Sequence, residues 1–386
     1  MVGLCSATSL YALFAALAMP FLGSWKKIRA VAYSNPPSSV SVLKPLCGAE
    51  PQLFENLATF CEQDHPCFQL IFGVASAHDT AIAVVHQLQN AYPNRDIDLI
   101  VDPRIHGANR KVSNLINMVP HARYDILVLA DSDIAVSRDY LRIVTAPVNA
   151  RAHQVGVVTC LYRARGIAGV WSKLGAMFIN AWFAPSVRVA HTLGSRSFGF
   201  GSTLAFHKLT LTRIGGFEAL KDCLADDFML AKFARDQGLA TVLSPLLVTT
   251  DVIEQSLEEL WSREIRWLRT IRSVNPAGFA SLFITFTVPW QILSVGILEV
   301  AHLHPLTMFS ASHTALTLLT ISTVVGIIAR LLIHARGCWG WRDLIFDIPL
   351  IPLRDILLAL QWLGASIGSH VRWRGTRVPV ANPCSK

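Results

Sequence analysis

Two acidic pairs in the sequence have the residue types and spacing of groups that bind metal ions or move protons. Asp131 and Asp133 are separated by one serine and follow the apolar run 125–130 directly. Carboxylate oxygens are the ligands that Mg²⁺ and Mn²⁺ prefer, and substrate phosphates commonly complete their coordination. The pair therefore predicts a site for a divalent cation and a diphosphate. A solvated pair of aspartates at the end of a strand is an equally good interpretation of this tripeptide taken alone.

The second pair, Asp226 and Asp227, begins a stretch with helical spacing that extends to Gln237. Acidic side chains in the first turn of a helix cap it and interact favourably with its dipole. A carboxylate in this position can also act as a general base that takes a proton from an attacking hydroxyl group. Both interpretations stay open, because one residue of the pair can serve each purpose.

A basic motif, Arg263-Glu-Ile-Arg266-Trp267, lies on a predicted helix that continues to Arg272. A spacing of three places Arg263 and Arg266 on one helix face, where two guanidinium groups can hold a diphosphate. The alternative is a basic helix that rests on anionic lipid. The two interpretations are compatible, since the stretch leads directly into an apolar segment.

Short apolar runs alternate with amphipathic stretches between residues 38 and 262, which predicts an α/β domain with a largely parallel sheet covered on both faces. Helical spacing occurs at 79–91 and 110–119. The predicted strands are Val40–Leu43, Phe68–Val74, Ile97–Val101, Asp125–Ala130, Val155–Val158 and Thr241–Leu243. Ligands of such sheets bind at the carboxyl ends of the strands, where Asp131 and Asp133 are expected to lie.

Apolar segments on both sides of this domain explain why only 16% of the residues are charged, against roughly 25% in ordinary soluble domains. Residues 1–24 carry no charge and are followed at once by basic residues, which favours an uncleaved anchor over a signal peptide. Two more spans are predicted near 280–300 and 308–333. The last apolar stretch, 344–367, contains prolines and ionisable residues, which favours a re-entrant or surface-lying hairpin over a full span.

The net charge of +8 belongs mainly to segments that flank the apolar runs. Thirteen of the 34 lysines and arginines lie in the windows 25–29, 263–272, 330–342 and 372–377. The positive-inside tendency places these segments, and with them the α/β domain, in the cytoplasm. The α/β domain lacks a basic patch interleaved with aromatic residues, so nucleic-acid binding is not predicted.

These observations predict a definite order of segments along the chain. They are an N-terminal transmembrane anchor at 1–24, a cytoplasmic domain at 38–262, a basic interfacial helix at 263–277, membrane segments at 278–371 and a basic tail at 372–386. With the motifs in this order, the chain resembles the ceramide glucosyltransferase family of membrane glycosyltransferases, including its bacterial hopanoid-biosynthesis relatives. Further segments that carry the resemblance are Leu43–Gly48, His78-Asp79, Gly107–Leu115 and Trp373–Arg377.

The resemblance implies an inverting enzyme with a Rossmann-like, nucleotide-sugar-binding domain of the GT-A type, inserted between the N-terminal and C-terminal membrane helices. It implies transfer of one sugar, glucose or N-acetylglucosamine, from a UDP-sugar to the hydroxyl group of ceramide or a hopanoid, with Mg²⁺ or Mn²⁺ as cofactor. The implied location is a bacterial inner membrane, crossed several times, with the catalytic domain in the cytoplasm. Alternatives are a polyprenyl-phosphate sugar transferase and a membrane protein that binds a nucleotide-sugar without turnover.

The resemblance also implies roles for individual residues. Asp227 is the expected catalytic base, and Asp131 and Asp133 are the expected metal ligands. The expected donor-binding residues are Asp79, Asn109, Lys111, Asp131, Asp133, Arg263, Arg266 and Trp267. The expected acceptor-side residues are Asp226, Gly201 and Trp267. In one departure from the animal-type enzymes, Ala184-Pro185 stands where they have a His-Pro pair, which weakens the case for ceramide itself.

Overall fold

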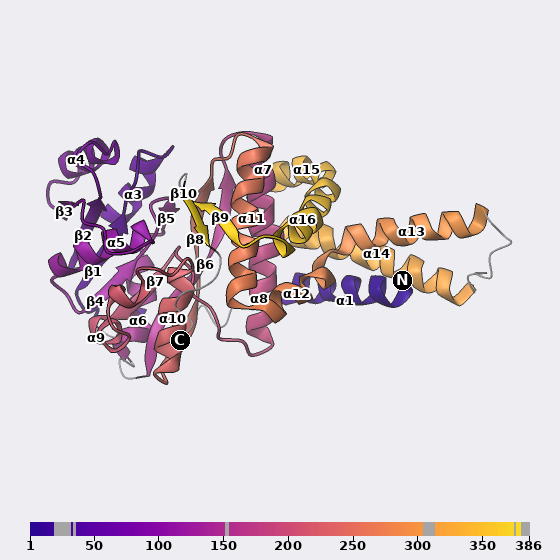
Figure 1. Cartoon of the computed structure of the whole chain (residues 1–386), viewed down its shortest axis with the longest axis horizontal. Helices are drawn as coiled ribbons and strands as arrows, with labels where there is room; N and C mark the ends of the chain where they lie inside the picture. Colours follow the sequence, from indigo (N-terminus) through magenta and orange to yellow (C-terminus); the bar gives the residue numbers. More distant parts are fainter. Residues whose placement is uncertain (19–31, 34–35, 151–153, 304–312, 374–375, 380–386) are drawn as a thin grey trace. The chain divides into compact units, whose positions relative to one another are not determined.

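The computed structural model of the chain describes residues 1–18, 32–33, 36–150, 154–303, 313–373 and 376–379. These residues form two compact units (Figure 1). The sheet unit comprises the described residues of 23–163 and 195–251. The helical unit comprises those of 1–22, 164–194 and 252–381.

The sheet unit is built on an eight-stranded mixed sheet with the order β3-β2-β1-β4-β7-β6-β8-β5. Its strands are β1 (Val40–Pro45), β2 (Phe68–Val74), β3 (Asp96–Val101), β4 (Ile126–Leu129), β5 (Ile134–Ala135), β6 (Val155–Gly166), β7 (Leu204–His207) and β8 (Ala240–Val252). Strands β3, β2, β1 and β4 are parallel, whereas β7 is antiparallel to β4 and β6, and β5 is antiparallel to β8. The predicted α/β fold is confirmed, and all six predicted strands are present.

The sheet is mixed rather than largely parallel because it includes two short strands that the sequence pattern does not predict. With two residues in β5 and four in β7, neither run is long enough to display a period of two. β7 pairs with β4 from Ile126↔His207 to Leu129↔Leu204. An isolated β-bridge between Phe200 and Thr203 precedes β7. Because β7 is antiparallel to its neighbours, no crossover helix is needed to connect it.

Helices cover both faces of the sheet, as predicted. On one face Val40 and Val42 of β1 belong to a core shared with α3 (Leu53–Cys61), α4 (Ala81–Ala91) and α6 (Tyr140–Ala150). On the other face Leu43 belongs to a core shared with α5 (Arg110–Met118) and α10 (Asp226–Asp236). The alternation of side chains along β1 separates the two cores. Helix α10 begins at Asp226, as the sequence predicts.

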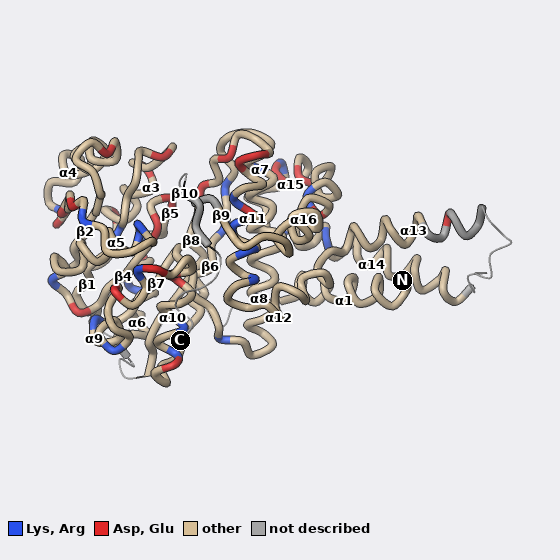
Figure 2. The backbone as a smooth tube through the Cα atoms, viewed as in Figure 1, with Lys and Arg blue, Asp and Glu red and all other residues tan. Residues whose placement is uncertain are grey.

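The helical unit contains the apolar segments of the chain. Its helices are α1 (Val2–Ala18), α7 (Val170–Phe178), α8 (Ala184–Thr192), α11 (Leu257–Val274), α12 (Pro276–Ser281), α13 (Thr287–Leu303), α14 (His313–Gly337), α15 (Trp341–Asp347) and α16 (Ile351–Ser366). A π-helical turn at Ile179–Phe183 joins α7 to α8, and β9 (His370–Trp373) pairs with β10 (Thr376–Pro379). Figure 2 shows that α1, α13 and α14 carry few charged residues.

One described helix segment, Thr314–Gly337 of α14, is long and apolar enough to cross a membrane. The span predicted at 280–300 is not a straight helix, because the helical segments Pro276–Thr285 and Thr287–Gly296 meet at an angle of 54°. They make a second membrane crossing only if the two segments together form one bent span. Helix α1 is apolar but shorter. The rest of the predicted anchor and the window 25–29 lie outside the described residues, as does most of the predicted tail.

The stretch 344–367 consists of α15, a 3₁₀ turn at Ile348–Leu350 and α16. Its ionisable residues are buried against other protein groups. Asp347 lies 3.0 Å from Lys173 Nζ, Asp355 pairs with Arg330, and Arg354 Nη2 lies 2.8 Å from Glu264. Ionised groups near a membrane are tolerated when protein surrounds them. The hairpin stays a prediction, and these contacts are compatible with it.

Helix α1 packs on α13 and α14 through small and hydroxyl-bearing side chains. Cys5 Sγ lies 2.8 Å from Ser294 Oγ of α13, and Ser6 Oγ lies 2.8 Å from Ser322 Oγ of α14. In lipid, close approach of small residues and interhelical hydrogen bonds hold helices together. These contacts make α1 an integral part of the helical unit.

Replacing Gly326 of α14 with leucine is expected to destabilise this packing. A Cβ atom at Gly326 would collide with Gln291 Nε2 and lie 2.7 Å from Ser9 Oγ. Overpacking of a filled site costs about 1–3 kcal/mol, so the thermal unfolding midpoint of the purified protein in detergent should fall by about 5 °C. Gly296→Leu is the control, because a Cβ there meets nothing within 4 Å. Equal thermal unfolding midpoints for Gly326→Leu and Gly296→Leu would contradict the close packing of α14 against Ser9 and Gln291.

Candidate active site

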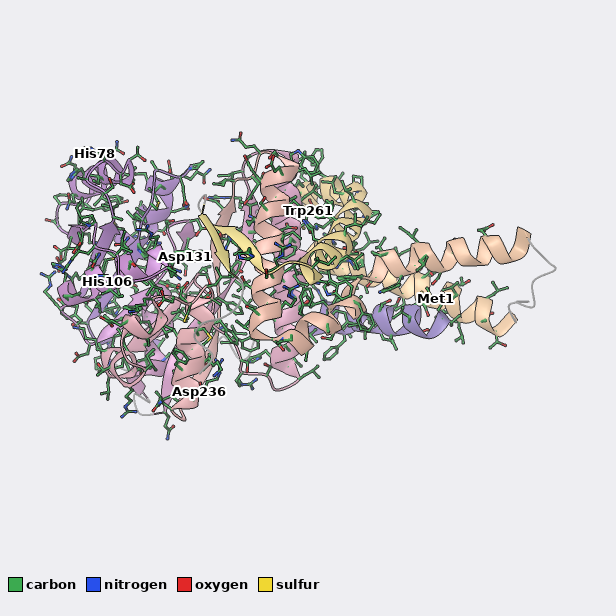
Figure 3. All side chains as sticks on the ribbon, in the orientation of Figure 1. Met1, His78, His106, Asp131, Asp236 and Trp261 are labelled. Atoms are coloured by element: carbon green, nitrogen blue, oxygen red, sulfur yellow. The ribbon has the colours of Figure 1, made fainter. Side chains whose placement is uncertain are left out.

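The two acidic pairs lie together in the sheet unit, where Lys111 of α5 joins them. Lys111 Nζ is 2.7 Å from Asp131 Oδ1 and 3.4 Å from Asp226 Oδ2. The backbone N–H of Asp131 donates to Gly201 O at 3.1 Å, and the N–H of Gly201 donates to Asp227 Oδ2 at 2.8 Å. We call these five residues the acidic cluster. Figure 3 labels Asp131, which follows β4.

Asn109 determines where Lys111 lies, because it caps the first turn of α5. Its Oδ1 accepts the N–H of Val112 at 3.1 Å, and such a cap stabilises a helix by about 1 kcal/mol. Its Nδ2 donates to Cys223 O at 2.8 Å and to Asp226 Oδ1 at 3.2 Å. Asn109 is buried and therefore connects the start of α5 to the start of α10. Its predicted role in donor binding stays a prediction.

Asp227 has the electrostatics of a general base. Burial raises its pKa to about 6, the charge of Asp226 adds to this rise, and Lys111 opposes it. Burial disfavours the charged form of Lys111, but Asp131, Asp226 and Asp227 outweigh burial and raise its pKa. Lys111 is therefore a fixed cation, whereas Asp227 exchanges its proton close to neutral pH. A catalytic base is most effective when its pKa lies near the working pH.

Asp133 lies beside the acidic cluster and supplies a second carboxylate after β4. Its Oδ2 accepts the hydroxyl hydrogen of Thr250 on β8 at 2.7 Å, and burial together with the charge of Asp131 raises its pKa to about 7. Two mutually repelling carboxylates are a donor set that suits a hard divalent cation. The described residues contain no group of three or more His, Cys, Asp or Glu side chains arranged for a metal. The predicted role of Asp131 and Asp133 as metal ligands stays a prediction.

Two charged residues near Asp131 and Ser132, Lys44 and Glu50, are assigned no role by the sequence motifs. Lys44 of β1 is fully buried, its Nζ donates to Asp131 O at 2.5 Å, and it lies 3.9 Å from the centroid of the Phe60 ring. Burial lowers its pKa to about 7, against the opposing effect of the nearby carboxylates. Glu50 Oε2 accepts the hydroxyl hydrogen of Ser132 at 2.9 Å. The signal that the sequence offers is a lysine inside a strand with no other charged residue.

Asp79 follows β2 and lies at the same edge of the sheet as Asp131. Strands β2, β1 and β4 are parallel neighbours, so their carboxyl ends share one edge. Asp79 Oδ1 accepts the N–H groups of Gly48 and Ala81, each at 2.9 Å. It therefore ties the loop after β1 to the start of α4.

The basic motif lies in the helical unit, on α11. Arg263 Nη1 is 2.8 Å from Glu254, and its guanidinium carbon is 5.3 Å from the centroid of the Trp267 ring. The side chain of Arg263 is only 13% exposed. Trp267 in turn lies 5.9 Å from Phe178, measured between ring centroids. Arg263 is thus committed to an ion pair in this structure, and the donor-side roles of Arg263, Arg266 and Trp267 stay predictions.

Comparison with known proteins agrees with the motifs. The sequence profile of glycosyl transferase family 21 matches residues 8–383. Ceramide glucosyltransferase 1 of Caenorhabditis elegans is 26% identical over 237 residues, which are 61% of this chain and 50% of that protein. Ceramide glucosyltransferase 3 of Caenorhabditis elegans is 21% identical over 358 residues, 88% of this chain and 74% of that protein. The predicted resemblance is confirmed, although the first match spans only half of that relative's length.

Among solved structures, one match is the mannosyltransferase PcManGT from Pyrobaculum calidifontis in complex with GDP-Man and Mn²⁺. The two chains share 16% sequence identity with a TM-score of 0.49, over 93% of this chain and 99% of that one.

Proposed function

Because the chain belongs to glycosyl transferase family 21, we propose that it transfers a single sugar from a UDP-sugar to the hydroxyl group of a membrane lipid. The sugar is glucose or N-acetylglucosamine, and the lipid is ceramide or a hopanoid. The supporting observation is the acidic cluster, in which three carboxylates surround Lys111 beside the carboxyl end of β4. The proposed setting is a bacterial inner membrane, with the sheet unit in the cytoplasm.

In the proposed reaction Asp227 is the general base. Its carboxylate takes the proton of the lipid hydroxyl while the hydroxyl oxygen forms a bond to the anomeric carbon, on the face opposite the diphosphate. The bond between that carbon and the diphosphate oxygen breaks, the oxygen keeps the electron pair, and UDP leaves. The configuration at the anomeric carbon is inverted in this single displacement, so no second, nucleophilic carboxylate is needed. With a pKa of about 6, Asp227 is mainly ionised at neutral pH and ready to accept the proton.

The donor side of the proposed site is centred on Asp131 and Asp133, which would hold Mg²⁺ or Mn²⁺. When bound, such an ion stabilises negative charge on the departing diphosphate. Lys111 places a fixed positive charge beside Asp131, which serves the same purpose. The other proposed donor-side residues are Asp79, Asn109, Arg263, Arg266 and Trp267. The proposed acceptor-side residues are Asp226, Gly201 and Trp267.

The test uses the purified full-length chain with UDP-glucose or UDP-N-acetylglucosamine and either short-chain ceramide or a hopanoid alcohol. We expect release of UDP and a lipid product heavier by one sugar residue. Chelation of divalent cations with EDTA should stop both, and added Mg²⁺ or Mn²⁺ should restore them. Binding of the donor without UDP release would contradict the proposal and favour a non-catalytic protein. An acid-labile product formed only with polyprenyl phosphate would favour a polyprenyl-phosphate sugar transferase.

Gly201→Ala is expected to disturb the donor side of this site. A Cβ atom at Gly201 would lie 2.5 Å from Asp131 Oδ2 and 3.2 Å from Lys111 Nζ, so the ion pair has to move. A displacement of about 1 Å in an active site can cost about a hundredfold in rate. We expect kcat/KM for the UDP-sugar to fall by that order. Gly296→Ala, in open space, is the control, and a Gly201→Ala enzyme of parental efficiency would contradict this geometry.

A further inference from the structure

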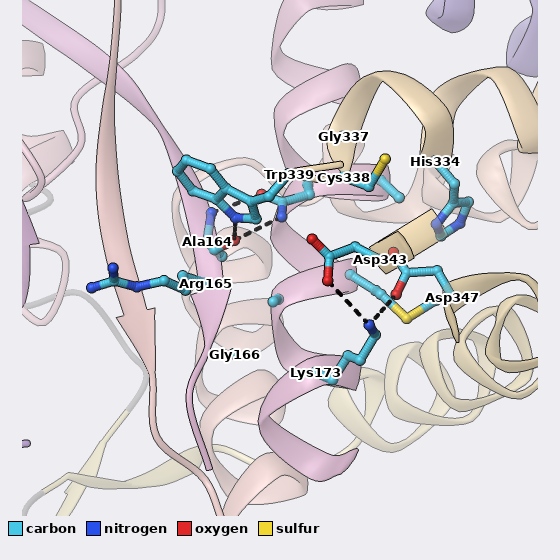
Figure 4. Close-up of a pocket in the computed structure, with 14 residues that line it drawn as sticks. Ala164, Arg165, Gly166, Lys173, His334, Gly337, Cys338, Trp339, Asp343 and Asp347 are labelled. Atoms are coloured by element: carbon cyan, nitrogen blue, oxygen red, sulfur yellow. Dashed lines mark hydrogen bonds and ion pairs between the residues drawn. The ribbon is translucent and has the colours of Figure 1, made fainter. Parts of the chain in front are cut away.

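The helical unit contains a cavity of about 310 Å³ beside the carboxyl end of α14. Its walls come from the end of β6, from α7 and the π-helical turn after it, from the end of α14, and from α15 (Figure 4). This volume lies at the lower end of the range for ligand pockets, and it corresponds to about ten water molecules. The described residues that line the cavity include none of the predicted site residues.

One lysine and two aspartates form the charged part of the cavity. Lys173 Nζ lies 3.0 Å from Asp347 Oδ1 and 3.9 Å from Asp343 Oδ1 (Figure 4). The side chain of Arg165, also part of the lining, extends away from this group in the same view. The ammonium of Lys173 is therefore already compensated by carboxylates. Such a group does not favour an anionic phosphate, but it leaves carboxylate oxygens that can accept hydrogen bonds.

Other polar groups of the cavity wall are satisfied within the protein. Asn180 Oδ1 accepts the N–H of Ala164 at 2.7 Å, and its Nδ2 donates to Ala164 O at 2.9 Å. Trp339 Nε1 also donates to Ala164 O, at 3.1 Å. Asp343 differs from these satisfied groups because its side chain is 49% exposed and its carboxylate can accept further hydrogen bonds. Since Ala176 and Met177 supply apolar surface, the cavity combines a half-exposed acceptor with an apolar wall.

The surroundings of the cavity point to the bilayer as the source of its ligand. The candidate span in α14 ends at Gly337, which lines the cavity. The adjacent α15 exposes Trp341, Ile345 and Phe346. Large exposed apolar side chains next to the end of a membrane helix are typical of the membrane interface.

We propose that this cavity binds the uncharged polar head of a membrane lipid. A hydroxyl or amide group of the head other than the reacting hydroxyl donates a hydrogen bond to the Asp343 carboxylate, and the adjoining apolar part of the lipid packs on Ala176 and Met177. The inference rests on the proposed function, because the acceptor lipid is the molecule with such a head that this protein would need to hold.

The thiol of Cys338 lines the cavity and can report its occupancy. The full-length Asp227→Asn protein, used to prevent turnover, is treated with N-ethylmaleimide, and alkylation of each cysteine is followed by mass spectrometry. Short-chain ceramide is expected to slow the alkylation of Cys338 about tenfold and to leave that of Cys47, exposed in the sheet unit, unchanged. No protection of Cys338 would overturn the proposal, and so would equal protection by phosphatidylglycerol or phosphatidylcholine.

Two variants connect this binding to the proposed reaction. Asp343→Asn weakens the acceptor group and is expected to raise KM for short-chain ceramide about tenfold. Asp236→Asn is the matched control, since Asp236 is 51% exposed and pairs with Lys232 on α10. Ala176→Leu fills the cavity without changing its charges, so protection of Cys338 by ceramide should be lost.

The two proposals fail in different ways. If Asp343→Asn and Ala176→Leu keep the parental KM for ceramide and the parental protection of Cys338, the cavity does not bind the lipid head, even though the parent enzyme transfers sugar. If ceramide protects Cys338 but the parent protein forms no glycolipid, the lipid site stands and the proposed function falls.

Discussion

Asp227→Asn is expected to lower kcat for sugar transfer by about 10²–10⁴-fold, the usual contribution of a positioned general base. Asp227 accepts the N–H of Gly201 on Oδ2 and the N–H of Phe228 on Oδ1, each at 2.8 Å, and the asparagine amide oxygen can still accept one of the two. The unfolding midpoint of this variant is therefore measured together with its turnover. The amide cannot take a proton from the lipid hydroxyl. The measurement is steady-state UDP release at saturating donor and acceptor.

The control for this variant is Asp236→Asn at the other end of α10, where Figure 3 labels Asp236. It makes the same chemical change in the same helix, on an exposed side chain that pairs with Lys232 at 2.6 Å. Its kcat should stay within twofold of the parent. Full turnover by Asp227→Asn would show that another group accepts the proton.

The pKa of Asp227 also sets the pH dependence of the reaction. Burial and the charge of Asp226 raise this pKa to about 6, and the base works only when it is deprotonated. We therefore expect kcat/KM to rise with pH through about 6 and to level off above it. Asp226→Asn removes the largest charge effect that raises this pKa, so the acid limb of the profile should move to lower pH. An acid limb that does not move would mean that a different group titrates.

The sequence predicts the position of each acidic pair, because the structure around each pair is local. The apolar run before Asp131 indicates a strand, and the spacing after Asp226 indicates a helix. The contacts of Lys111 with both acidic pairs depend on tertiary structure, because they form only when β4, α5 and α10 pack together. The burial of Lys44 is likewise decided by the layers above and below β1. The sequence of that strand shows only that a charged residue stands among uncharged ones.

The structure differs from the sequence-based predictions at two further places, the basic motif on α11 and the span at 280–300, for similar physical reasons. The spacing of Arg263 and Arg266 predicts a shared helix face correctly, but it carries no information on Glu254, which reaches Arg263 from outside the helix. The apolar composition near 280–300 indicates a membrane segment whether or not the helix is continuous. Pro289 lies in the first turn of α13, where proline is tolerated, and proline disfavours helical continuation through the residues before it. A 54° bend at this place is consistent with that restriction.

Lys111→Met is expected to damage both stability and sugar transfer. Lys111 compensates Asp131 and Asp226, and its side chain is only 18% exposed. Removing one partner of a buried ion pair costs about 3–5 kcal/mol, which we reduce to about 2–3 kcal/mol because Asp131 is 38% exposed and screened by solvent. The unfolding midpoint of the full-length protein should fall accordingly, and kcat/KM for the UDP-sugar should fall with it.

A second substitution separates these two effects of Lys111. In Lys111→Met/Asp226→Asn one uncompensated charge is gone, so part of the lost stability should return, and the difference from additivity measures the coupling between the two residues. Sugar transfer should not return, because the charge that Lys111 offers to a departing diphosphate is still missing. Lys111→Arg keeps that charge and should retain measurable transfer. If the double variant recovered transfer, Lys111 would act by neutralising Asp226 alone, and its proposed place on the donor side would have to be abandoned.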